Sequence, residues 1–273
     1  MGIKNSKGFT LIELLLSVAL GSIIVAGATT LYFTAQKTQM IQSNLADLQE
    51  RTSLAFTQIK TSLSKSSLYT DNLNQNLKNG IIFNGVPSDE VLVSSSELGP
   101  SYVDKKSDQL TVKYQSPQGG YDCEGNAVPA NGEVIERYFL RQSKTHNNTL
   151  ALACDAGRIQ SGAIEDFGDD GIELLTGVLY FHTLYAIGSG RNYHSYSNTP
   201  NNSDQNSISG VQVGLLISSV GSDKMQKEFE GKSKFQVINQ EVTLESDYEK
   251  NARKGLIDVI ELRIPVNGVG VEL

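Results

Sequence analysis

The chain has 273 residues, and its 30 acidic side chains outnumber its 23 lysines and arginines, which gives a formal net charge of −7. This length allows one or two domains with a real hydrophobic core. The acidic balance provides no bulk electrostatic attraction to nucleic acid, so we expect no nucleic-acid partner.

An uncharged apolar segment dominates the N-terminal region. Residues 14–36 contain no charged side chain, and the apolar run 14–33 supplies about the 20 residues that a helix needs to cross a bilayer. Lys4 and Lys7 precede this run, so the positive-inside tendency places the N-terminus in the cytoplasm and the rest outside. An ordinary secretory signal has a shorter apolar core that is followed by its cleavage site. We therefore expect a retained transmembrane helix over residues 9–35.

The residues at the start of this run carry a family resemblance. Gly8 is followed by Phe9-Thr-Leu-Ile-Glu13-Leu. This G-F-T-L-I-E-L segment, behind a short basic leader, resembles the N-terminus of type IV prepilins. The resemblance implies that prepilin peptidase removes the leader, residues 1–8, by cutting the Gly8–Phe9 bond. It also implies that the new N-terminal amine of Phe9 is methylated.

Glu13 is the one acidic residue between Lys7 and Lys37. A carboxylate within an apolar segment is costly and is usually paired or functional. We expect it to pair with the N-terminal ammonium of a neighbouring subunit, in a charge-assisted contact at low dielectric. The alternative is a plain signal anchor in which the carboxylate of Glu13 is incidental.

The helical pattern continues beyond the apolar run. No proline occurs before Pro87 and no glycine between Gly27 and Gly80, so we expect one helix over residues 9–68, on the order of 90 Å long. The apolar positions of its second half are Ile41, Leu45, Leu48, Ala55, Phe56, Ile59 and Leu63. Their steps, mostly of three and four residues, predict one apolar face. We expect the globular part of the chain to cover that face.

Residues 69–273 are expected to form one β-rich head. The predicted fold class is therefore α+β, with a long N-terminal helical stalk packed against this head. Clusters of Asn, Ser, Gly and Asp separate short alternating or β-branched runs, which is typical of strands joined by turns. Residues 188–210, rich in Ser, Asn and Gly, are expected to form an exposed loop. The predicted strands are 80–83, 91–94, 109–115, 133–142, 150–154, 174–187, 211–219, 235–239 and 256–266.

The chain has two cysteines, Cys123 and Cys154, and both follow the expected membrane span. An oxidising compartment favours a disulfide, and two cysteines allow a single pairing. Closing the loop of about 32 residues would stabilise the fold by roughly 3.5–4 kcal/mol on the chain-entropy model. Two free buried thiols are the alternative.

The sequence lacks the motifs of catalysis and of metal binding. Its histidines, His146, His182 and His194, are scattered. They lack the groupings that build a zinc site, and the chain has neither a nucleophile elbow nor a P-loop. The acidic segment 165–173 lacks the spacing of a calcium loop, so a solvated acidic turn is expected, with calcium binding left open. We expect no enzyme activity, no cofactor and no metal site.

The head carries a second resemblance. Residues 122–140 place Cys123 in a C-x-G-x-x-V segment that leads into an R-Y-F strand, and Cys154 follows after a hairpin. This order is similar to the PilW group of minor pilins. Thr30 stands where many major pilins have a proline, and the head is larger than most of them carry. The J pseudopilin of type II secretion shares the general layout but usually has a shorter head.

The PilW-type resemblance implies a minor pilin that takes part in type IV pilus assembly by priming the filament, with the tip as its expected position. A J-type pseudopilin at a pseudopilus tip, or a tip adhesin or DNA-binding pilin subunit, are the alternatives. The implied partners are other minor pilins and the major pilin, bound through the N-terminal helix, with prepilin peptidase, the inner-membrane assembly platform and membrane lipid before assembly. The implied location is the inner membrane, single-pass with a periplasmic head, and then the pilus at the cell surface.

Overall fold

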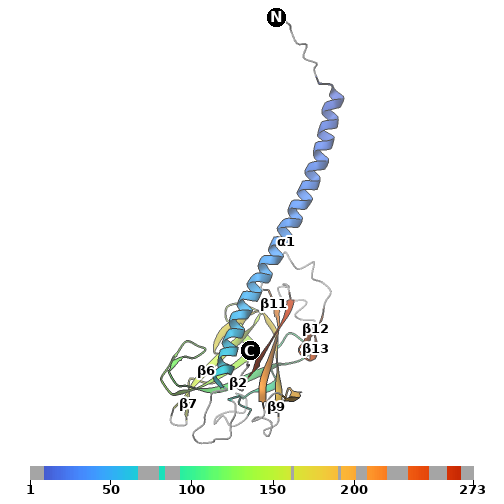
Figure 1. The fold of residues 1–273 in the computed structure, drawn as a ribbon. Coiled ribbons are helices and arrows are strands. Elements are labelled where there is room, and N and C mark those ends of the chain that lie inside the picture. Colours follow the sequence, from blue (N-terminus) through green and yellow to red (C-terminus); the bar gives the residue numbers. More distant parts are fainter. Residues whose placement is uncertain are drawn as a thin grey trace. The chain divides into compact units, whose positions relative to one another are not determined.

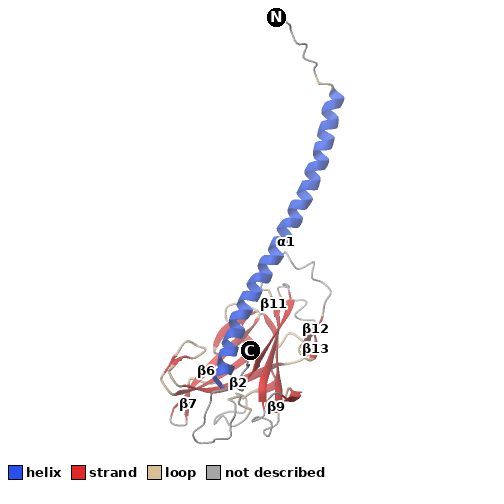
Figure 2. Cartoon of the chain, viewed as in Figure 1, coloured by secondary structure: helices blue, strands red, loops and turns tan. Residues whose placement is uncertain are grey.

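The computed structural model describes residues 9–66, 80–83, 93–160, 163–189, 192–200, 208–219, 233–245 and 257–265. These residues form one long helix and a strand-rich domain, which is the expected α+β class (Figure 1, Figure 2). The chain divides into two compact units, Met1–Ala46 and Asp47–Leu273. Helix α1 (Leu11–Ser66) contributes residues to both units.

In the first unit, α1 presents a continuous apolar surface. The large hydrophobic side chains from Phe9, just before the helix, to Phe33 are 56–85% exposed. Thr29, Thr30 and Thr34 donate their hydroxyls to carbonyls one turn earlier, so these polar groups are satisfied within the helix. By length and composition α1 could cross a membrane, and it is the one such helix among the described residues. An exposed apolar surface of this extent indicates a site that contacts lipid or another protein.

In the second unit, the C-terminal part of α1 has one buried face. The buried residues are Leu48, Thr52, Ala55, Phe56, Ile59, Ser62, Leu63 and Ser66. Their steps of three and four residues place them along one side of the helix. The apolar members join the main hydrophobic core of the head. The predicted apolar face is therefore confirmed from Leu48 to Leu63, and this packing explains why the second unit begins within the helix.

The first sheet has six antiparallel strands in the order β1-β2-β5-β6-β7, with β8 also paired to β6. Strand β5 pairs with β6 from Glu133 to Gln142, and Tyr138 lies opposite Cys154. The strands are β1 (Ser95–Gly99), β2 (Ser107–Ser116), β5 (Gly132–Gln142), β6 (Leu150–Gln160), β7 (Ala163–Glu165) and β8 (Ile172–Thr176).

The second sheet has four antiparallel strands in the order β10-β9-β11-β14. Its central strand β11 is buried at every position, as expected for a strand covered on both faces. The strands are β9 (Val178–Ser189), β10 (Asn192–Ser197), β11 (Ile208–Ser218) and β14 (Ile257–Pro265). The described part of the head also contains two short hairpins, β3 (Gly120–Tyr121) with β4 (Ala127–Val128) and β12 (Lys234–Val237) with β13 (Gln240–Thr243).

The main core joins the buried face of α1 to side chains from both sheets. Phe56, Ile59 and Leu63 of the helix belong to it, together with Val112 of β2 and Val213 of β11. A second cluster combines side chains of β9 and β11 with those of the β12–β13 hairpin. Both sheets are thus fixed to one helix, and burial of these side chains supplies the main hydrophobic stabilisation of the head.

The predicted strand 174–187 is wrong in one respect, because it is two strands in different sheets. Gly177 lies between β8 and β9 and has a φ of +86°, a left-handed conformation that glycine adopts readily. Its N–H donates to the Leu150 carbonyl at 2.9 Å, and its carbonyl accepts from the N–H of Ser218 at 2.8 Å. The chain therefore passes from the first sheet to the second at this glycine.

Other differences fall where turn-forming residues weaken the strand pattern. The strand expected at 80–83 is a single bridge made by Ile81. Near 91–94, the described strand is β1, a few residues later. The loop expected at 188–210 contains β10, which pairs with β9, while part of that segment lies outside the described residues. Polar strands such as β10 lack the apolar alternation on which the predictions depended.

Candidate functional site

The first turn of α1 holds the carboxylate of the apolar region. The N–H and the hydroxyl of Thr10 both donate to Oε2 of Glu13 at 3.0 Å. In return, the N–H of Glu13 donates to the Thr10 hydroxyl oxygen at 3.4 Å. This is a capping box, which satisfies N–H groups that have no partner at a helix start. The T-x-x-E spacing signals the box in the sequence, but the sequence-based prediction assigns Thr10 no role.

The geometry leaves Glu13 able to bind a further donor. An ionised carboxylate has about four acceptor positions, and the bonds from Thr10 use one oxygen. The N-terminal end of a helix also favours a negative charge. Phe9, which carries the expected mature N-terminus, is 85% exposed at the same end of the helix. Lys4, Lys7 and Gly8 of the expected leader lie outside the described residues.

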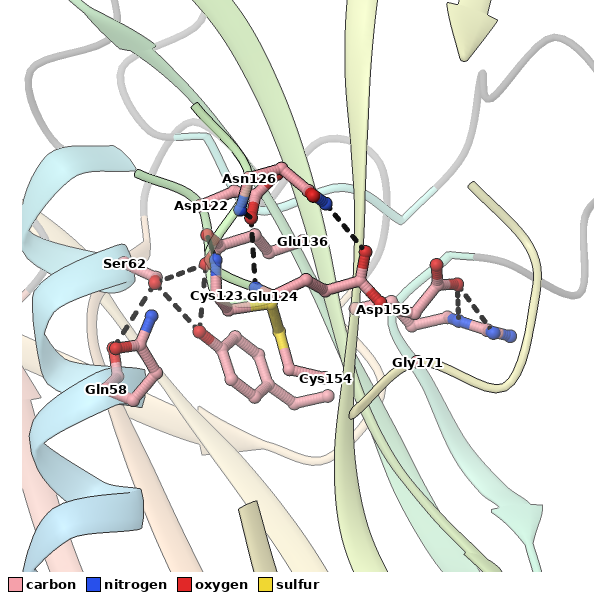
Figure 3. The surroundings of a disulfide bond; sticks show 12 residues. Gln58, Ser62, Asp122, Cys123, Glu124, Asn126, Glu136, Cys154, Asp155 and Gly171 are labelled. Carbon is pink, nitrogen blue, oxygen red and sulfur yellow. Dashed lines mark hydrogen bonds and ion pairs between the residues drawn. A yellow bond between two sulfur atoms is a disulfide. The ribbon is translucent and has the colours of Figure 1, made fainter. Parts of the chain in front are cut away.

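The expected disulfide joins Cys123 to Cys154, with their Cα atoms 6.3 Å apart. Cys123 lies in the turn of the β3–β4 hairpin, and Cys154 lies in β6 (Figure 3). Both cysteines are buried. The bridge therefore fastens a short hairpin to the first sheet, and the free-thiol alternative is not observed.

Next to the disulfide, Glu136 of β5 is a fully buried carboxylate. It accepts a hydrogen bond from the Ser62 hydroxyl of α1 (Figure 3). It also accepts hydrogen bonds from the Tyr114 hydroxyl at 2.8 Å, the Tyr138 hydroxyl at 2.9 Å and the Cys123 N–H at 2.9 Å. A buried carboxylate is costly unless it is well hydrogen-bonded. One side chain thus joins the helix, the sheet and the disulfide turn.

The tyrosines of this network act as permanent donors. Burial, followed by the negative charge of Glu136, raises the pKa of the Tyr114 and Tyr138 hydroxyls, so both stay protonated. Ser62, Glu136 and both tyrosines are 0% exposed. The network therefore anchors the helix to the sheet and is closed to any substrate. Sequence reasoning missed it, since only the fold brings these residues together.

The acidic segment 165–173 forms a turn that two arginines of β5 hold in place. Arg137 donates to the carbonyl of Asp169 at 2.7 Å. Arg141 donates to the carbonyls of the next two residues at 2.6 and 3.1 Å. The carbonyls of the turn therefore face guanidinium groups, while the side chains of Asp166, Asp169 and Asp170 are exposed, as expected for a solvated acidic turn.

Of the three histidines, the structure describes the side chains of His146 and His182. His146 is exposed in the β5–β6 hairpin. His182 is buried, and its Nδ1 lies 2.8 Å from Asp108 Oδ2 while its Nε2 lies 2.9 Å from Asn239 Oδ1. The same Asp108 oxygen also accepts from the N–H and hydroxyl of Thr183. This cluster ties β2 to β9 and to the β12–β13 turn, which is a structural role.

Comparison with known proteins places the similarity at the N-terminus. Residues 3–29 match the family model described as the prokaryotic N-terminal methylation motif. No curated protein matches the chain. Among solved structures, the chain is similar to a type IV-like pilin from Thermus thermophilus, at 15% identity over 62% of this chain and 81% of that chain, with a TM-score of 0.31. A likeness of that size carries no weight for the head. The methylation motif and the apolar helix that begins within it support a type IV pilin-like protein.

Proposed function

We propose that the chain is a minor pilin of the PilW type that helps to prime assembly of a type IV pilus. Its leader is removed at the Gly8–Phe9 bond, the amine of Phe9 is methylated, and residues 9–35 anchor it in the inner membrane. The observation that carries the proposal is one carboxylate, Glu13, which lies within the methylation motif at the start of a helix whose large hydrophobic side chains are exposed as far as Phe33.

The exposed apolar surface of the helix has to be covered both before and after assembly, first by lipid and then by neighbouring subunits. In the membrane, lipid covers the apolar side chains between Phe9 and Phe33 and offers a spanning helix a suitable thickness. During assembly the same surface leaves lipid, and the helices of neighbouring subunits replace the cover. Small residues on the helix, such as Gly21 and Gly27, have open space around them, which allows a neighbouring helix to approach closely.

Glu13 supplies specificity to this exchange. Before assembly its carboxylate is partly satisfied by Thr10 of the same chain. In the filament the methylated amine of a neighbouring subunit would add a charge-assisted bond, which is strong in an apolar surrounding. A subunit placed out of register would leave the carboxylate buried without a cation, at a cost that disfavours the wrong arrangement.

The minor-pilin assignment draws on the head and on the helix. Thr30 replaces a proline typical of major pilins, the head is large, and Cys123 and Cys154 stand in a PilW-like order. A subunit needed in few copies can carry a large head because it does not have to repeat along the filament.

The J-type pseudopilin of type II secretion is the alternative, and deletion of the gene distinguishes the two functions. Loss of pili supports the proposal, whereas loss of secretion with normal pili supports the alternative.

The role of Glu13 can be tested by Glu13→Ala in the native host, with Glu50→Ala as the matched control. Glu50 is an exposed carboxylate on the same helix, beyond the apolar region. We expect Glu13→Ala to be processed to a methylated Phe9 by intact mass and to enter the membrane. It should nevertheless lose co-purification with other minor pilins and reduce surface pili counted by electron microscopy, while Glu50→Ala behaves as wild type. Unchanged co-purification and piliation in Glu13→Ala would refute the proposed role.

A further inference from the structure

We propose that Glu124, Asp155 and Asp169 bind a divalent cation of the calcium type beside the disulfide. The three residues come from different elements: the β3–β4 turn, strand β6 and the acidic turn before β8. One carboxylate oxygen of each lies within 4.8 Å of the others. Oxygens on opposite sides of a calcium ion stand about 5 Å apart, because Ca–O distances are about 2.3–2.6 Å. A single ion can therefore contact all three carboxylates.

Asp155 provides an observation that is independent of the cluster itself. Its side chain is 0% exposed, and its Oδ2 is bound by Arg137 at 2.7 Å and by the N–H of Gly168 at 3.0 Å. Its Oδ1 is buried and has no hydrogen-bond partner among the described residues. Figure 3 shows this carboxylate beside that of Glu124. A buried polar atom without a partner costs free energy, and a cation at Oδ1 would be the missing partner.

The charges around the site also favour a cation. The carboxylates of Glu124, Asp155 and Asp169 converge on this place, and like charges so close together repel one another. The neighbouring guanidinium of Arg137 is engaged by Asp155 Oδ2 and by the carbonyl of Asp169. The mutual repulsion of the carboxylates is therefore incompletely balanced by protein cations, and a divalent ion would neutralise it.

The disulfide holds the ligands in position. Glu124 and Asp155 each directly follow one of the two bridged cysteines. The turn that carries Asp169 packs on the same place, because a Cβ at Gly171, whose φ is +59°, would lie 2.2 Å from the carbonyl oxygen of Cys154. Ligands fixed before binding lose less entropy when the ion arrives. Cation affinity should therefore depend on the oxidised state of the bridge.

The ligand set selects calcium over the smaller magnesium. All three groups are carboxylates, and two of them lie in turns, so the coordination sphere can take an irregular shape and include water. Calcium accepts such spheres of six to eight oxygens, whereas magnesium demands a near-ideal octahedron and dehydrates reluctantly.

The test uses the full-length protein in detergent, stripped with EDTA and titrated with CaCl2 by calorimetry, with the melting temperature measured in parallel. We expect one calcium ion per chain and a melting temperature that rises with calcium, since an ion that binds only the folded state stabilises it. Asp169→Asn should weaken calcium binding about tenfold or more. Asp170→Asn is the matched control, because its carboxylate pairs with Lys144 at 2.9 Å instead, and it should bind calcium as wild type.

Three results would overturn the proposal. The first is no heat and no change in melting temperature at calcium concentrations up to about 1 mM, the range of weak extracellular sites. The second is equal calcium affinity in Asp169→Asn and wild type. The third is equal binding of MgCl2, which would exclude the calcium-type site. Reduction of the disulfide should weaken calcium binding in the folded protein, and an unchanged affinity would contradict the part assigned to the bridge.

Discussion

The hydrogen-bond network of Glu136 predicts how much stability the protein loses when the hydroxyl of Ser62 is removed. In Ser62→Ala, Glu136 stays buried but loses the hydroxyl donor of α1, while its bonds from Tyr114, Tyr138 and Cys123 remain. A hydrogen bond to a charged group contributes about 1.5–3 kcal/mol. Alanine is the better helix former by up to about 0.5 kcal/mol. The expected net loss in the free energy of unfolding is therefore about 1–2.5 kcal/mol.

The measurement is urea unfolding of the full-length protein in detergent, followed by tyrosine fluorescence, since the chain has 11 tyrosines and no tryptophan. Ser53→Ala is the control, because Ser53 is an exposed serine on the same helix. Its replacement should raise the free energy of unfolding only through the higher helix propensity of alanine. A second comparison places Ser62→Ala in a Glu136→Gln background, where a neutral acceptor reduces the loss to about 0.5–1.5 kcal/mol. If Ser62→Ala is as stable as Ser53→Ala, the anchor makes no contribution and the reasoning fails.

Two further predictions concern the disulfide and the neighbouring Glu124. The double variant Cys123→Ser/Cys154→Ser should lose about 3.5–4 kcal/mol of unfolding free energy, and a loss under about 1 kcal/mol in urea unfolding would contradict the chain-entropy account. The pKa of Glu124 is raised from 4.5 to about 7 in the folded protein, so the native state binds the extra proton and stability in EDTA should fall as pH rises through this window. In Glu124→Gln the urea midpoint should fall less between pH 5 and 7.5 than in wild type. If the urea midpoints of both proteins fall equally with pH, groups other than Glu124 cause the effect.

The helix was largely predictable because its signals are local. The uncharged run, the absence of proline, the absence of glycine after Gly27, and the apolar steps from Leu48 to Leu63 all act over one or two turns. Even the capping box of Thr10 and Glu13 follows from a four-residue spacing. The strands of the head were predictable where apolar or β-branched residues recur, as in β5 and β11, and less so where polar residues dominate, as in β10.

The division of one apolar run between two sheets could not be predicted from pattern. Residues 174–187 are apolar on both sides of Gly177. A strand that is buried on both faces shows no alternation of apolar and polar residues, so the sequence pattern does not change where one strand ends and the next begins. The positive φ of Gly177 marks the break, but a glycine within a strand pattern also fits a bulge. The choice depends on the pairing of β8 with β6 and of β9 with β11.

The sequence alone decided the N-terminal pattern of this protein, which is an apolar helix with one carboxylate behind a short basic segment, and the single possible cysteine pair. Only the tertiary structure decided where the remaining charges lie. Glu136 meets Ser62 across 74 residues of chain, and Glu124, Asp155 and Asp169 meet at the disulfide. The physical reason is that hydrophobic periodicity and capping act between near neighbours, whereas the burial and partners of a carboxylate depend on contacts that form only when distant segments pack.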